Sequence, residues 1–265
     1  MARPRICTTT FAACTPPLLT RMTHAHTWQA ENGVDIYLHV LDSFPDDDRI
    51  ARIGGKFLSR ITGDSIEELI AILREKGVSA AQMERTLALL ASLAIEGKSM
   101  EDIVHNGGVQ ALVDALELGL SGKALENTCK AIARIAANAR NIQALVDAGA
   151  IGALVTSLGS SGATSDSKAQ AIEALCRIAA NSQYTEAVVA AGSIPAVVAA
   201  LASDPSNAGL AAACLKFFTT LQKNNFDMDT VAATDGAIAA VVSAMAANPS
   251  SQVSSHTSLP PPCSH

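Results

Sequence analysis

The sequence is poor in aromatic residues, which make up 3% of its 265 positions and include a single tryptophan, Trp28. Hydrophobic residues nevertheless account for 49% of the chain, which is enough for a substantial core. Ala, Leu, Val and Ile must fill that core, and these residues suit close-packed helices better than thick sheets. The composition therefore predicts a folded, all-α protein.

Basic charge and long hydrophobic runs are also scarce. The chain has 19 Lys and Arg against 25 Asp and Glu, a formal net charge of -6, and no basic face that would gather phosphates. Gly, Asp, Glu, Lys or Arg interrupts each apolar run before it reaches the length of a membrane span. We therefore expect no nucleic-acid partner and no membrane-spanning segment.

Signatures of catalysis and of metal or cofactor binding are missing as well. The sequence has no phosphate-binding GxxxxGK loop followed by Ser or Thr, no G-x-S-x-G elbow, no HExxH and no CxxC. Its six cysteines are expected to be reduced thiols, with Cys129, Cys176 and Cys214 as small core residues of alanine-rich helices. The sequence predicts a protein that is not an enzyme and that holds no cofactor and no metal.

The chain does contain an internal repeat. The segments "HNGGVQALVDAL", "DAGAIGALVTSL", "AAGSIPAVVAAL" and "TDGAIAAVVSAM" align on Gly107, Gly149, Gly192 and Gly236, at spacings of 42, 43 and 44 residues. A period just above 40 residues without strand-like alternation predicts stacked helical units, each of which buries its apolar face against its neighbours.

Three helices are expected in each unit. The first ends at the glycine, whose positive φ lets the chain turn sharply. The second starts two residues later, with apolar side chains at the i, i+3, i+4, i+7 spacing of one helix face, as at Ile151, Leu154, Val155 and Leu158. The third follows a polar or glycine-rich loop, as in "SKAQAIEALCRIAAN". A fainter unit, whose second helix begins near Ile66, precedes the four aligned segments.

Segments such as "NIQALVDAGAIGALVTSLGSS" and "YTEAVVAAGSIPAVVAALASDPS", with the third helices around them, resemble armadillo repeats over roughly residues 59–249. The resemblance implies a right-handed α-solenoid of four to five stacked three-helix units. It also implies a concave groove, lined by the third helices, that receives an extended peptide segment.

The resemblance also places candidate groove residues. Importin-α, a member of that family, holds basic cargo with a repeated Trp and a repeated Asn. In this sequence the Trp positions are occupied by Ala88, Lys130, Glu173 and Lys216. The Asn positions are occupied by Ser92, Arg134, Arg177 and Thr220. Neither the Trp nor the Asn series is present, which argues against an importin-α-like cargo carrier. The cationic residues favour an acidic extended segment as partner. Alternatively, these are solvated side chains, with Glu173 and Arg177 an ordinary i, i+4 pair.

The expected function is a non-catalytic scaffold or adaptor for protein–protein interaction. The alternative is a structural subunit of a large assembly, such as a ciliary or organellar complex. A cytoplasmic location is expected, with an organellar or ciliary one as the alternative.

The two ends of the chain differ from the repeats. Residues 1–31 are Arg- and Thr-rich and contain no acidic residue before Glu31, which indicates a disordered extension or an organellar transit peptide. Residues 32–58 are expected to be capping helices, and residues 250–265 a disordered tail. The last unit lacks a third helix, so it is either a degenerate final repeat or an open end that docks onto a partner or onto a second copy of the chain. The Gly- and Ser-rich loop at 159–167 is expected to be a flexible insertion, with regulation by phosphorylation as a further idea.

Overall fold

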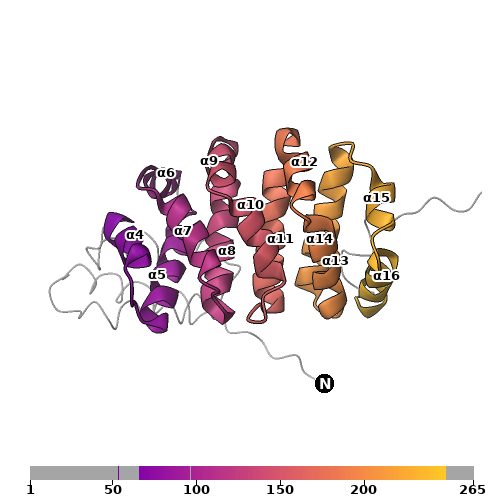
Figure 1. Cartoon of the computed structure of the whole chain (residues 1–265), viewed down its shortest axis with the longest axis horizontal. Helices are drawn as coiled ribbons and strands as arrows, with labels where there is room; N and C mark the ends of the chain where they lie inside the picture. Colours follow the sequence, from indigo (N-terminus) through magenta and orange to yellow (C-terminus); the bar gives the residue numbers. More distant parts are fainter. Residues whose placement is uncertain (1–52, 54–65, 96, 249–265) are drawn as a thin grey trace, which may run out of the picture.

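The computed structural model describes residues 53, 66–95 and 97–248, and every regular element within these ranges is helical (Figure 1). The helices form an elongated stack in chain order, so the predicted all-α solenoid is confirmed. The predicted extension at 1–31 and the tail at 250–265 lie outside the described residues, as do the predicted capping helices at 32–58 except for Ile53.

The helices fall into three rows that repeat along the stack. The first helices are α6 (Gly97–His105), α9 (Ile142–Asp147, preceded by the 3-10 turn η1, Ala139–Asn141), α12 (Ser182–Ala190) and α15 (Met228–Ala232). The second helices are α4 (Ile66–Arg74), α7 (Gly108–Glu117), α10 (Ala150–Leu158), α13 (Ser193–Ser203) and α16 (Ala237–Ala247). The third helices are α5 (Ala80–Leu93), α8 (Gly122–Ala136), α11 (Ser165–Ala179) and α14 (Ala208–Lys223). Each second helix packs on the second helices of adjacent units, and each third helix on adjacent third helices.

The four repeat glycines make the turns between first and second helices. Their φ angles of 75° at Gly107, 81° at Gly149, 83° at Gly192 and 78° at Gly236 all lie in the left-handed region. The turn brings α9 with its 3-10 turn to 79° from α10, and α12 to 71° from α13. The second helix begins directly after the glycine and not two residues later, because the left-handed residue completes the turn by itself.

Polar side chains start the helices that follow the loops. The side chains of Ser79, Thr164 and Asn207 accept hydrogen bonds from the backbone N–H groups of Gln82, Ser167 and Leu210 in the first turns of α5, α11 and α14. Because the first N–H groups of a helix have no partner within the helix, such caps stabilise its start by about 1 kcal/mol each.

One continuous core runs through the stack, made of side chains from all three rows of helices. Leu112, Leu154 and Ile172 are among its fully buried members, and Phe217 is the largest. Cys129, Cys176 and Cys214 are buried free thiols within it, as predicted. The aliphatic composition of the sequence is therefore matched by a core of close-packed helices.

The loop between α10 and α11 differs from its prediction. It spans residues 159–164, because Thr164 caps α11 and places residues 165–167 in the helix. The Gly162 carbonyl accepts a hydrogen bond from Gly122 N–H at 3.1 Å, and a Cβ at Gly162 would lie 2.4 Å from Ser121 Cβ. The loop therefore packs closely on the preceding loop, and its flexibility stays a prediction. Its regulation by phosphorylation stays a prediction.

Within the described ranges, no single helix has the length and apolar character of a membrane span, although two bent pairs, α9–α10 and α12–α13, pass that test together. The same residues contain no group of three or more His, Cys, Asp or Glu side chains arranged to hold a metal ion.

Candidate functional site

The third helices lie side by side in parallel along the stack (Figure 1). We define the third-helix face by the eight sequence-predicted positions Ala88, Ser92, Lys130, Arg134, Glu173, Arg177, Lys216 and Thr220. Successive members are 42 or 43 residues apart, so equivalent positions on α5, α8, α11 and α14 follow one another along the stack. Four of the eight are cationic and one is acidic, a local charge of +3 on a chain with a net charge of -6.

Glu173 is the centre of an ion-pair network on this face. Its carboxylate accepts a hydrogen bond from Arg177 Nε at 2.8 Å, one turn later on α11. The Lys216 ammonium, on α14, donates to both carboxylate oxygens at 2.8 and 2.9 Å. Burial by itself would raise the pKa of Glu173, but the hydrogen bonds and charges of Lys216 and Arg177 outweigh it and hold that pKa below its ordinary value. Glu173 therefore stays ionised and links two neighbouring third helices.

Arg134 and Arg177 each reach back to the preceding third helix. Arg134 Nη1 donates to the Ala91 carbonyl of α5 at 2.7 Å, and Arg177 Nη1 donates to the Ala133 carbonyl of α8 at 2.9 Å. Both carbonyls belong to the last turn of their helix, where backbone acceptors lack intrahelical partners. A guanidinium there satisfies the acceptor and opposes the negative end of the helix dipole.

The amides that would bond these carbonyls in a longer helix donate elsewhere. Ile95 N–H donates to the Ser92 carbonyl, and Ala137 N–H donates to the Arg134 carbonyl. The two arginines are therefore inter-repeat braces as well as surface cations. Sequence reasoning placed them on the third helices but missed this role, because the periodicity does not show which backbone group a side chain reaches.

The brace changes at the last third helix. Thr220, which occupies the arginine position on α14, donates to the Lys216 carbonyl at 2.8 Å and contacts Cys176 Sγ at 3.1 Å. One turn later, Asn224 donates to the Ala179 carbonyl of α11 and to Thr185 Oγ1. The amide therefore supplies the link between α11 and α14 that an arginine makes in the two preceding units.

The N-terminal members of the predicted set are not available at the surface. Ala88 is 9% exposed and Ser92 2% exposed, and Ser92 Oγ donates to the Ala88 carbonyl at 2.9 Å. The structure therefore brings Lys130, Arg134, Glu173, Arg177, Lys216 and Thr220 together on α8, α11 and α14, but Ala88 and Ser92 offer little to a partner.

A second row of polar side chains was missed by the sequence analysis. Asn127 and Gln170 are half-buried on α8 and α11, one turn before Lys130 and Glu173, and Arg85 occupies the same position on α5. These residues are also 42 or 43 residues apart. The same period that located the cationic positions could have found them, and they widen the polar strip of the third-helix face.

The fold was compared with known proteins. No family model and no curated protein matches the sequence. Among solved structures, the chain is similar to a designed armadillo repeat protein in complex with the peptide (KR)4, with a TM-score of 0.62, 21% identity, and coverage of 77% of this chain and 82% of that one. It is also similar to a computationally designed armadillo repeat protein for modular peptide recognition, with a TM-score of 0.59, 22% identity, and coverage of 80% and 97% of the two chains. The chain therefore has the armadillo-repeat fold.

Proposed function

We propose that this chain is a non-catalytic scaffold that binds an extended, acidic segment of a partner protein on its third-helix face. The observation that carries the proposal is the recurrence of cationic side chains on three successive third helices, with Glu173 as the only carboxylate among the eight defined positions. The similar designed proteins support the peptide-binding part, because one is in complex with a peptide and another was made for peptide recognition.

The sign of the charge sets the chemistry of the partner. The peptide in the designed complex is basic, whereas here Lys130, Arg134, Arg177 and Lys216 would repel Lys and Arg. Carboxylates suit these positions, because Arg and Lys make charge-assisted hydrogen bonds to them. Lys216 is more accessible than Arg177, with 58% of its side chain exposed against 34%.

The spacing of the helices limits the shape of the partner. Packed helix axes lie about 8–10 Å apart, and an extended chain advances about 3.3 Å per residue. Adjacent third helices therefore meet peptide side chains two to three residues apart. The preferred ligand is an extended segment with Asp or Glu at every second or third position, and not a compact acidic helix.

The direct test is a fluorescence anisotropy titration with labelled octapeptides. We expect an alternating Glu–Ser peptide to bind, a Lys–Ser peptide of the same length not to bind, and the affinity to fall as NaCl is raised from 50 to 300 mM. Lys216→Ala should weaken binding by about two- to fivefold, the loss of one largely exposed charge contact. The matched control, Lys98→Ala, removes an exposed lysine of α6, outside the third-helix face, and should leave the affinity unchanged.

Reversal of the two arginines provides the stronger perturbation. Arg134→Glu combined with Arg177→Glu should abolish binding of the acidic peptide, whereas Arg134→Lys combined with Arg177→Lys should retain most of it. Both arginines brace the third helices, so each variant is assayed at a temperature at which its circular dichroism at 222 nm matches that of the wild type. Equal binding of the acidic and basic peptides, or full binding by the folded Glu variant, would contradict the proposal.

A further inference from the structure

The last second helix exposes positions that earlier units bury. Ile151 of α10 and Ile194 of α13 are 8% and 3% exposed, but their equivalent on α16, Ile238, is 65% exposed. In the same way Val198 of α13 is 4% exposed, whereas its equivalent Val242 is 59% exposed. The sequence of α16 therefore retains core residues at positions that nothing in the described chain covers.

The neighbouring third helix has a matching open flank. Cys176 on α11 faces α14, because its Sγ contacts Thr220 Oγ1 at 3.1 Å and lies 3.9 Å from the Lys216 carbonyl. The equivalent of Cys176 on α14 is Thr219, 43 residues later, and Thr219 is exposed. Leu215, the equivalent of the fully buried Ile172, is only partly buried.

These side chains belong to α14 and α16, at the C-terminal end of the stack (Figure 1). We define the end face by Ala212, Leu215 and Thr219 of α14 and by Ile238 and Val242 of α16. None of the five side chains is charged. In the internal units a third helix of 15 residues, such as α8 or α11, occupies the equivalent space.

The printed sequence after α16 does not have the pattern of a third helix. Asn248 closes α16 by donating to the Pro205 carbonyl at 2.9 Å and to the Ala244 carbonyl at 2.8 Å. The sequence that follows, "PSSQVSSHTSLPPPCSH", has four prolines and only Val253 and Leu259 as aliphatic residues. It has neither the apolar spacing nor the uninterrupted length of a third helix.

We infer that the end face is an interface with a second copy of this chain, related by a two-fold axis. In such a contact each residue meets the same patch of the other copy, so like charges would face each other if the patch carried any. The uncharged end face has no such repulsion, and it hides Ile238 and Val242 from water.

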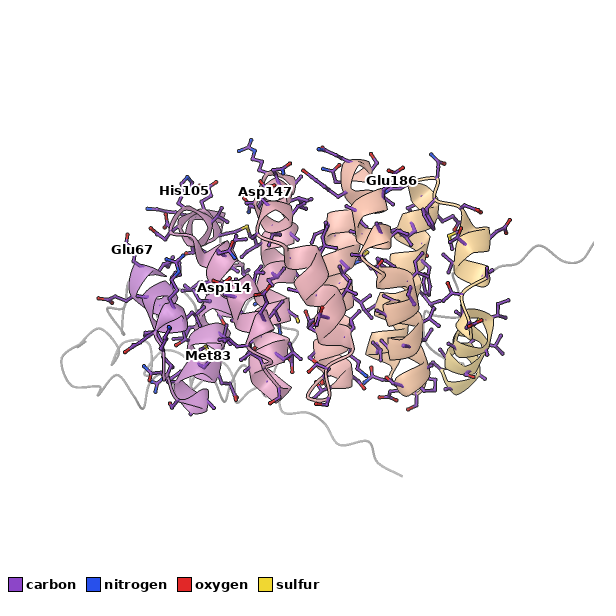
Figure 2. The ribbon with its side chains drawn as sticks, viewed as in Figure 1. Glu67, Met83, His105, Asp114, Asp147 and Glu186 are labelled. Atoms are coloured by element: carbon purple, nitrogen blue, oxygen red, sulfur yellow. The ribbon has the colours of Figure 1, made fainter. Side chains whose placement is uncertain are left out.

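A head-to-tail contact would place the end face of one copy against the α4 end of the next. Figure 2 shows Glu67 at the upper edge of α4, where this carboxylate is exposed on the first turn of the helix. Repetition of such a contact would not close after two copies. The two-fold contact buries no charge, and it closes after two copies and does not extend into a filament.

The size of the end face sets the expected affinity. At 1.5 Å per residue, the 16 residues of α14 and the 11 of α16 give helices of about 24 and 16 Å. With a helix width of about 10 Å, their projection of roughly 400 Å² is an upper limit for the end face, which is only part of it. Stable interfaces bury about 800 Å² per partner, so the dimer is weak. We expect a dissociation constant of about 10–100 µM for the dimer.

Sedimentation equilibrium of the full chain between 1 and 500 µM tests this inference. We expect the mass to rise from one to two chains across that range. The double variant Ile238→Asp with Val242→Asp should remain monomeric at 500 µM. The control Leu118→Asp alters another large apolar side chain, 69% exposed between α7 and α8, and should dimerise like the wild type.

A charge-complementation experiment distinguishes the two-fold contact from other arrangements. The variant Ile238→Lys with Val242→Lys should also be monomeric, but an equimolar mixture with the Asp variant should form a heterodimer. A wild type that is monomeric at 500 µM, a dimer unaffected by the Asp variant, or growth into larger polymers would overturn the inference. None of the five end-face residues belongs to the third-helix face, so this test is independent of the proposed peptide binding.

Discussion

The brace made by Arg134 gives the sharpest prediction for stability. Replacing Arg134 with Met keeps most of the aliphatic stem but removes the donor that reaches the Ala91 carbonyl at 2.7 Å. Hydrogen bonds to charged groups contribute about 1.5–3 kcal/mol to stability. The position of the guanidinium at the C-terminal end of α5 adds a few tenths of a kcal/mol, because it opposes the helix dipole. Because Arg134 is only half-buried, solvent recovers part of this, and we expect a net loss of about 1–2 kcal/mol in the free energy of unfolding.

The assay is thermal unfolding followed by circular dichroism at 222 nm. For a chain of this size, about 1–2 kcal/mol corresponds to a fall in Tm of about 2–8 °C. The control, Lys98→Met, removes an exposed cation of α6 and should change the free energy by less than about 0.5 kcal/mol. If the Arg134→Met and Lys98→Met proteins unfold at the same temperature, the inter-repeat brace does not stabilise the stack.

Three further predictions follow from single residues. Gly149→Ala should destabilise the fold by about 1–2 kcal/mol in urea unfolding, because φ is 81° at this position. Gly152→Ala, three residues later inside α10, should stabilise it by about 0.5–1 kcal/mol, because an added Cβ would have nothing within 4 Å. Glu173 has a lowered pKa in the folded state, so its ion pairs add stability above about pH 4.5 that is lost as the pH falls through the folded-state pKa. Glu173→Gln should therefore be less stable than wild type at pH 7, with the difference shrinking below about pH 4.5. Burial raises the pKa of Cys129 and Cys214 to about 12, so mass mapping after iodoacetamide treatment at pH 8 should find both unlabelled in native protein and labelled in guanidinium.

The parts of the fold that depend on local chemistry could be predicted from the sequence. The positive φ at Gly149 and its equivalents follows from glycine being the residue that tolerates it, between two apolar helical patterns. The burial of Cys129 and Cys214 follows from their alanine-rich helical context. These features need only a few neighbouring residues to specify them.

The features that were missed depend on contacts between units. The reach of Arg177 to the Ala133 carbonyl and the pairing of Lys216 with Glu173 join residues 43 or 44 positions apart, and the repeat period fixes the helix face without naming the acceptor. Ser92 was placed on the exposed face, but its hydroxyl is buried against the Ala88 carbonyl. The close packing of Gly162 on Ser121 was missed for the same reason.

Hydrogen–deuterium exchange with and without the alternating Glu–Ser octapeptide tests most directly the claim that the third-helix face binds an acidic segment. We expect slower amide exchange in α8, α11 and α14 on addition of the peptide, and no change in α9 and α12, which belong to the row of first helices. Protection confined to the first helices, or no protection at a saturating peptide concentration, would contradict it.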